Sequence, residues 1–188
     1  MAKEIWLIRH GETEWSLSGA HTGKTDLPLT PAGEQKAAKI GARLAGHQFA
    51  LVLTSPLQRA RRTCELAGFG AQAQLEPELM EWDYGDYEGR TTPDIQRERP
   101  GWSLFDDGVP NGESIGQVAV RARSVIERVN AVEGNVALFA HGHILRILGS
   151  CWLGLPPFDA RLFALGTAGI STLGYEHETR VFLRWNLQ

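Results

Sequence analysis

The chain has 188 residues, of which 43% are apolar and 22% are charged, and its formal net charge is −3. This composition excludes a disordered chain, and without an excess of positive charge neither nucleic acid nor an anionic membrane surface is expected as a partner. Cys64 and Cys151 are expected to be free thiols, and the sequence shows neither a signal peptide nor a membrane span, which together predict a cytoplasmic protein.

The first part of the chain predicts two buried strands, each followed by a helix. Residues 4–8 are a short β-prone apolar run, and residues 11–30, which lack helical periodicity, are expected to form a loop. Thr30 has the features of a helix N-cap, because proline follows it and an acidic residue lies in the first turn; this helix is expected to extend to residue 45. Residues 50–54 predict the second strand, and a helix over 57–67 should follow it.

The second part begins with a short strand near 73–76 and then becomes irregular. Residues 82–112 are rich in Gly, Pro, Asp and aromatic residues, with at most one short helix near 92–98. Because this segment is too long for a plain connection, it is expected to be a lid or an inserted, substrate-facing segment. The remaining predicted elements are an amphipathic helix over 113–132, a strand over 135–140, a helix over 144–154, and closing strands over 170–175 and 180–185.

The alternation of strands and helices predicts the fold class. Strands that alternate with helices favour a three-layer α/β/α arrangement, with a mostly parallel central sheet and helices on both faces. No linker divides the chain, so residues 1–188 are expected to form one domain, with 82–112 as its lid or insert.

Polar residues follow three of the predicted strands. Arg9 and His10 follow the first strand. Arg59 lies on the helix after the second strand, and His141 directly follows the strand at 135–140. Ligands bind outside the carboxyl ends of strands in an open α/β sheet, so we expect these side chains to converge at one rim. Guanidinium and imidazole groups together suit a dianionic phosphate.

Each of these residues also has an ordinary structural interpretation when it is taken alone. A strand-end histidine such as His10 is usually only hydrogen-bonded, Glu81 would be a surface carboxylate, and His143 would cap the following helix. Arg61 and Arg62 are typical of a solvated helix face. The combination of Arg-His, Arg and His-Gly at three strand ends is unusual, and it favours a phosphate site.

The sequence resembles the histidine phosphatase superfamily, the phosphoglycerate-mutase-like proteins. The segments that carry the resemblance extend from near the start of the chain to residue 143: LIRHGETEW at 7–15, TGKTDLPLTPAGEQKA at 22–37, TSPLQRARRTCE at 54–65, ELMEWDYGDYEG at 78–89, NGES at 111–114 and AHGH at 140–143. RHGE at a strand end is fairly specific alone, and the other motifs make a chance match improbable.

The resemblance implies a catalytic cycle. His10 matches the family's nucleophile, which forms a phosphohistidine, and Arg9, Arg59 and His141 match the residues that hold the phosphoryl oxygens. Glu81 matches the proton donor, which protonates the leaving group and then activates water. Neither a metal nor a cofactor is implied.

The resemblance also implies a set of substrate-binding residues for a small phosphorylated substrate. They are Ser16, His21, Thr22, Trp82, Tyr84 and Arg146. For Trp82 and Tyr84, packing within the lid is an equal alternative. A homodimer is kept open as the commonest oligomeric state of soluble proteins.

Within this family the sequence favours a phosphatase for a sugar phosphate or bisphosphate, close to the sedoheptulose-bisphosphatase-like branch. A cofactor-dependent phosphoglycerate mutase is the alternative, although the chain is short for one and has Ser16 where mutases have Asn. His21 stands where that phosphatase branch commonly has Tyr, which leaves the sugar open. A phosphoprotein phosphatase or an inert phospho-ligand binding module ranks lower.

Overall fold

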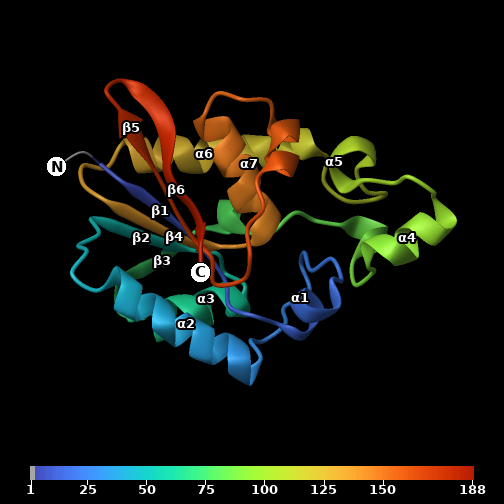
Figure 1. Cartoon of the computed structure of the whole chain (residues 1–188), viewed down its shortest axis with the longest axis horizontal. Helices are drawn as coiled ribbons and strands as arrows, with labels where there is room; N and C mark the ends of the chain where they lie inside the picture. The colour runs from blue at the N-terminus through green and yellow to red at the C-terminus, as the bar shows by residue number, and fades with distance from the viewer. Residues whose placement is uncertain (1–2) are drawn as a thin grey trace.

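The computed structural model describes residues 3–188, and its frame is a six-stranded sheet with the strand order β3-β2-β4-β1-β5-β6 (Figure 1). The neighbouring strands from β3 to β1 pair in parallel, whereas β5 and β6 are antiparallel additions at one edge. The predicted mostly parallel sheet is therefore confirmed. The strands are β1 (Ile5–Arg9), β2 (Leu51–Thr54), β3 (Ala73–Leu75), β4 (Val136–Ala140), β5 (Ile170–Glu176) and β6 (Thr179–Leu187).

Helices cover both faces of this sheet, as predicted. In Figure 1, α2 and α3 lie on one face, and α6 and α7 lie on the other. The helices are α1 (Glu14–Ser18), α2 (Pro31–Leu44), α3 (Gln58–Leu66), α4 (Thr92–Glu98), α5 (Leu104–Asp107), α6 (Ile115–Asn130) and α7 (Gly142–Trp152). Short 3₁₀ turns occur at Gly70–Gln72, Pro77–Leu79, Gly85–Tyr87 and Pro157–Leu162.

Alternation along β1 divides the hydrophobic core into two layers. Ile5 and Leu7 belong to the larger cluster, which includes α6 and α7, while Trp6 and Ile8 belong to the cluster with α2. Successive side chains of a strand point to opposite faces, so a central strand with both faces covered is apolar at every position. The all-apolar start of β1 is thereby explained.

The predicted loop over residues 11–30 is wrong at one point, because it contains the helix α1. Thr13 caps this helix, and its backbone and side chain exchange hydrogen bonds with Ser16. Five residues are too few to show a helical period, so only the capping pair carried a signal. The same limit applies to α5, a second short helix where one at most was expected within 82–112.

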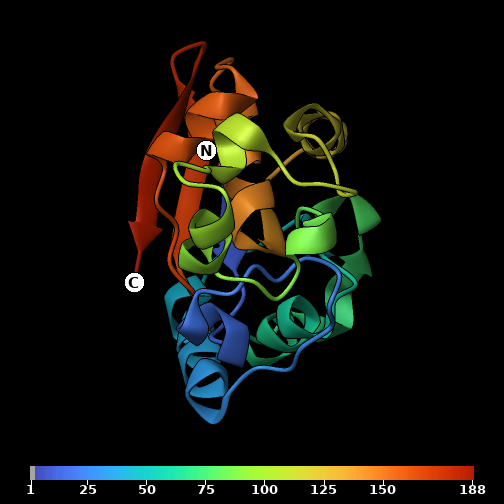
Figure 2. The same ribbon diagram turned by 90° about the vertical axis from the view of Figure 1, so that its right-hand side faces the viewer.

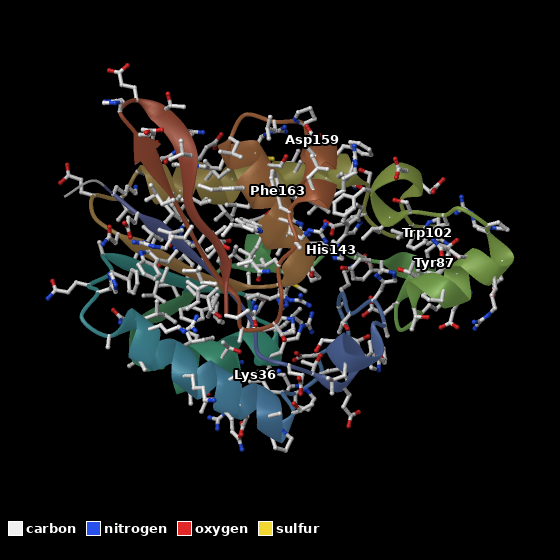
Figure 3. All side chains as sticks on the ribbon, in the orientation of Figure 1. Lys36, Tyr87, Trp102, His143, Asp159 and Phe163 are labelled. Carbon is white, nitrogen blue, oxygen red and sulfur yellow. The ribbon has the colours of Figure 1, made fainter. Side chains whose placement is uncertain are left out.

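Residues 82–112 project beyond the sheet at its carboxyl end, beside α1 (Figures 1 and 2). Tyr87 and Trp102 pack edge to face within this segment, with ring centroids 5.2 Å apart (Figure 3). The segment joins the loop after α1 through backbone hydrogen bonds between His21 and the residues Gly89 and Arg90. An irregular segment with its own aromatic core is thus tied to the amino-terminal loop.

Two glycines let the loop after β1 lie directly against the first turn of α2. A β-carbon at Gly11 would lie 2.5 Å from the carbonyl oxygen of Gly33, and one at Gly33 would lie 2.2 Å from the carbonyl oxygen of Glu12. Any larger residue would push this loop, and the end of β1 with it, away from α2.

None of the helices within residues 3–188 is long and apolar enough to cross a membrane. Both cysteines are free thiols: Cys64 is buried and Cys151 is half-buried.

Candidate active site

The carboxyl ends of β1, β2 and β4 meet, as the strand order requires. The His10 N–H donates to the Ala140 carbonyl at 2.9 Å, and the Ser55 N–H donates to the Phe139 carbonyl at the same distance. These bonds bring the residues that follow the three strands together beside a cavity of about 250 Å³. The predicted convergence of far-separated polar residues is observed.

His10 sits at the inner end of this cavity with one ring nitrogen engaged. Its Nδ1 lies 2.6 Å from the carbonyl oxygen of Gly11. A carbonyl only accepts, so Nδ1 carries the proton and Nε2 has a free lone pair. Burial lowers the pKa of His10 well below its usual value, and the positive charges of Arg9 and Arg59 lower it further. The imidazole is therefore neutral at pH 7, and its unprotonated nitrogen is the nucleophilic one.

Gly11, whose carbonyl orients the His10 ring, is itself held from α3 through its N–H. Its N–H donates to Thr63 Oγ1 at 3.0 Å, while the Thr63 hydroxyl donates to the Arg59 carbonyl at 2.7 Å. Because the Thr63 hydroxyl donates its only hydrogen to the Arg59 carbonyl, its oxygen is available to accept a hydrogen bond from the Gly11 N–H. Thr63 is fully buried, and it anchors the amide side of the residue whose carbonyl bonds the His10 ring.

Arg9 lines the cavity next to His10. One terminal nitrogen donates to the Leu165 carbonyl, whereas Nε has no hydrogen-bond partner among residues 3–188 although it is buried. A buried N–H without a partner is costly. Gly142 passes close to the guanidinium, since a β-carbon there would lie 3.3 Å from Arg9 Cζ.

Arg59 and His141 lie behind His10 and are fully buried. Arg59 Nε donates to His141 Nδ1 at 3.0 Å, and His141 Nε2 lies 2.8 Å from Ser55 Oγ. Burial, followed by the charge of Arg59, lowers the pKa of His141 well below its usual value, so its Nε2–H is the donor to Ser55. The His10 and His141 rings are 5.2 Å apart. For His141 to hold a phosphoryl oxygen, its Nε2–H must exchange Ser55 for that oxygen.

The other bonds of Arg59 go to the loop of residues 22–25. Its terminal nitrogens donate to the carbonyls of Thr22, Gly23 and Thr25 at 2.8–3.1 Å. Four of the five guanidinium hydrogens are thus used. From the opposite side, the Glu88 carboxylate accepts from the N–H groups of Gly23 and Thr25. The loop is held between a cation that binds its carbonyls and an anion that binds its amides.

Glu81 is buried rather than a surface carboxylate, and it lines the same cavity. Its carboxylate accepts three backbone N–H bonds, from Trp82 at 3.0 Å, His143 at 3.0 Å and Ile144 at 2.9 Å. The last two belong to the first turn of α7, which begins after His141. An acid placed on a helix N-terminus is stabilised in one position, so these three bonds fix the Glu81 carboxylate in the lining of the cavity.

Five of the six expected substrate-binding residues line the cavity, and one does not. The five are Ser16, His21, Thr22, Tyr84 and Arg146. Arg146 is held by bonds from its guanidinium to the carbonyls of Ala160 and Arg161. Trp82 is fully buried instead, and its Nε1 donates to the Glu113 carbonyl at 2.8 Å. The position of Trp82 therefore fits the alternative to substrate binding, which is packing.

The structure adds cavity residues that the sequence did not single out as binding residues. They include Trp15, Thr92 and His143. Tyr84 Oη lies 2.6 Å from His143 Nδ1, and His143 lies between α7 and the projecting segment in Figure 3. The pKa of Tyr84 is raised by burial and that of His143 is lowered by burial, so both are neutral. His143 lies inside α7 rather than capping it, and its spacing of two from His141 was the only sequence signal.

The assembled site combines a neutral histidine nucleophile, two guanidiniums and one carboxylate. This set can bind a phosphoryl group, attack it at phosphorus and move a proton at the leaving oxygen. Within residues 3–188 no group of three or more His, Cys, Asp and Glu side chains is placed to hold a metal ion.

Comparison with known proteins identifies the relatives of this chain. The model of the family described as the histidine phosphatase superfamily (branch 1) matches residues 5–188. An acid phosphatase of Mycobacterium tuberculosis is 39% identical over 180 residues, which cover 94% of this chain and 88% of that protein. The sedoheptulose 1,7-bisphosphatase of Saccharomyces cerevisiae is 37% identical over 182 residues, covering 79% of this chain and 67% of that protein.

A relative with a different name and one solved structure complete the comparison. A protein of Photorhabdus laumondii named as a probable phosphoglycerate mutase, GpmB, is 32% identical over 192 residues, covering 97% of this chain and 89% of that protein. The solved structure of the open reading frame Rv3214 from Mycobacterium tuberculosis has a TM-score of 0.93 at 37% identity, covering 99% of this chain and 98% of that one.

Three histidines of the site with a strongly lowered pKa predict how the stability of the protein depends on pH. His10, His141 and His143 all have a folded-state pKa well below the unfolded value near 6.5. Below pH 6.5 the unfolded chain therefore binds protons that the folded chain does not, and the free energy of unfolding should fall as pH falls. The expected slope is up to about 1.4 kcal/mol per pH unit for each histidine.

Urea unfolding at pH 7.0, 6.5, 6.0 and 5.5 in phosphate-free buffer measures this slope. The window lies above the usual pKa of the carboxyl groups, so acidic residues contribute little to it. Replacing one of these three histidines, as in His143→Gln, should remove the contribution of one histidine from the slope. A free energy of unfolding that stays constant from pH 7.0 to 5.5 would contradict the neutral state of these rings.

Proposed function

Since the chain belongs to the histidine phosphatase superfamily (branch 1), whose model matches residues 5–188, we propose that it hydrolyses a small phosphomonoester through a phosphohistidine on His10. We infer that the substrate is a sugar phosphate or bisphosphate. The observation that carries the proposal is the His10 ring: a neutral imidazole with Nδ1–H bonded to Gly11 and Nε2 free, between the guanidiniums of Arg9 and Arg59.

In the first step, His10 Nε2 attacks phosphorus in line with the ester oxygen. The N–P bond forms as the P–O bond to the leaving group breaks, and Glu81 in its protonated form donates a proton to the leaving alkoxide. Arg9 meets the phosphoryl oxygens with the terminal N–H groups that Leu165 does not use, while Arg59 contributes its positive charge. These groups stabilise the charge on the equatorial oxygens in the transition state.

In the second step, the Glu81 carboxylate accepts a proton from water, and the water oxygen attacks phosphorus. The P–N bond breaks, and inorganic phosphate leaves with His10 neutral and Glu81 protonated, ready for the next cycle. The three N–H bonds to Glu81 hold its oxygens in place for both transfers. In this scheme two arginines supply the positive charge, so no metal or cofactor takes part.

The substrate class rests on the relatives and on the outer part of the cavity. Of the relatives compared here, one is named for a sugar bisphosphate and another as an acid phosphatase. Arg146, His21 and Thr92 lie away from the strand ends in the same cavity, where they can meet the hydroxyl or anionic groups of a sugar.

Residues 82–112 are proposed to act as the lid of the domain. Free thiols, as found at Cys64 and Cys151, suit the reducing cytoplasm.

A phosphoglycerate mutase is the second candidate, because a relative with that name aligns over 97% of the chain. In a mutase the phosphoryl group returns from histidine to the substrate, which requires water to be kept out of the cavity. The two candidates share the first step and differ only in what attacks the phosphohistidine.

The nucleophile is tested by His10→Ala. Loss of Nε2 should reduce phosphatase activity below about one thousandth of the parent rate, because the covalent step has no other nucleophile. Rapid quenching with ³²P-labelled substrate should trap an acid-labile, base-stable label in the parent and none in the variant. His47→Gln, a change at an exposed histidine outside the cavity, serves as the control. Turnover by His10→Ala near the parent rate would refute the mechanism.

Glu81→Gln tests the proton donor. Cleavage of p-nitrophenyl phosphate needs little acid assistance and should keep kcat/KM within about tenfold of the parent. Cleavage of an alkyl ester such as glycerol phosphate should lose roughly 10²–10⁴-fold. Equal losses on both substrates would show that Glu81 is not the acid.

The choice between phosphatase and mutase is tested with 3-phosphoglycerate and its bisphosphate activator. A phosphatase should produce no 2-phosphoglycerate, whether or not it releases inorganic phosphate from these compounds. A coupled enolase assay detects the mutase product, with a sugar bisphosphate assayed in parallel for phosphate release. Formation of 2-phosphoglycerate faster than release of phosphate would reverse the ranking.

A further inference from the structure

The backbone on both sides of Glu81 is held by a single side chain from α6. Arg121 donates from one terminal nitrogen to the carbonyls of Glu78 and Met80, both at 2.8 Å, and from the other to the carbonyl of Glu81 at 3.3 Å. Its Nε and second terminal nitrogen donate to the two carboxylate oxygens of Glu113, also at 2.8 Å. All five guanidinium hydrogens are therefore used.

Glu113 extends the same clamp to the residues that follow Glu81. Its Oε2 accepts from the Asp83 N–H at 2.9 Å, and its own N–H donates to the Asp83 carbonyl at 3.0 Å. Its carbonyl also accepts from Trp82 Nε1. Arg121 and Glu113 thus bind every residue from 80 to 83 through backbone or side-chain atoms. Their side chains are only 16% and 21% exposed, so the bidentate pair is largely shielded from water.

The position of the Glu81 carboxylate depends on this backbone. The carboxylate must meet the N–H groups of Trp82, His143 and Ile144 while it faces the cavity. A shift of the backbone by about 1 Å would break these bonds, and misplacements of that size can cost about 10²-fold in rate. The segment that carries Glu81 has no helix or strand of its own between Leu79 and Gly85 to prevent such a shift.

We propose that Arg121, paired with Glu113, is a positioning residue that sets the Glu81 carboxylate for proton transfer. This inference rests on the proposed role of Glu81. Arg121 does not line the cavity, so it acts only through Glu81 and its neighbours. Lysine cannot replace it, because an ammonium group presents neither the planar fork nor five donors.

The test compares Arg121→Lys with Arg128→Lys, a matched change on the same helix. Arg128 also bonds side chains of the preceding segment, Glu76 and Gln74, but it lies away from Glu81. Arg121→Lys should lower kcat/KM for glycerol phosphate about 10- to 100-fold and change kcat/KM for p-nitrophenyl phosphate much less. Arg128→Lys should leave kcat/KM unchanged for both glycerol phosphate and p-nitrophenyl phosphate. Glu113→Gln, which removes the charge but keeps an oxygen, should show the same selective loss as Arg121→Lys.

A double variant separates this inference from the proposed function. In a Glu81→Gln background, Arg121→Lys should cause no further selective loss, because the group it positions has been removed. If Glu81→Gln is selective for the poor leaving group but Arg121→Lys and Glu113→Gln affect both esters equally, or neither, the positioning role is overturned. If Glu81→Gln itself is not selective, the acid role fails first. Near-ultraviolet circular dichroism confirms that each variant is folded.

Discussion

The buried guanidinium of Arg59 is the group on which the rest of the site depends. Removing a cation from water costs on the order of several kcal/mol, and Arg59 recovers this through carbonyl groups and the His141 ring. These partners satisfy four of its five N–H groups, and within residues 3–188 no carboxylate forms an ion pair with it. Its charge adds to the effect of burial in keeping His10 and His141 neutral, and it favours a dianion in the cavity.

Irregular backbone near the cavity is held in two places by charged side chains from regular elements or from the facing segment. Arg59 and Glu88 hold the loop of residues 22–25 from opposite sides, and Arg121 with Glu113 holds residues 78–83. A loop held in this way keeps its dipoles oriented before any ligand arrives. Such preorganisation is the form of electrostatic stabilisation that phosphoryl transfer uses most.

Much of this arrangement could be predicted because its signals are local. The Thr30-Pro31 start of α2 and the apolar run of β1 act within a few residues, and the convergence of strand ends follows from a parallel sheet. The short helices α1 and α5 contain too few residues for periodicity. Arg121 has the same appearance in the sequence as other cations on α6, so only its tertiary contacts distinguish it. Likewise, nothing local decides that Tyr84 reaches the cavity while Trp82 is buried behind it.

The central place of β1 in the sheet has a consequence for the order in which the molecule forms. β1 is paired with β4 on one side and with β5 on the other, and Arg9 takes its carbonyl partner from Leu165. These contacts have very high sequence separation, so they close late and at the largest entropic cost. Synthesis proceeds from the amino terminus, so His10 is one of the first residues produced. Because the contacts of β1 form late, His10 is also one of the last to reach its final position. The strand end that carries Arg9 and His10 therefore has its full set of neighbours only after β5 has been made and has joined the sheet.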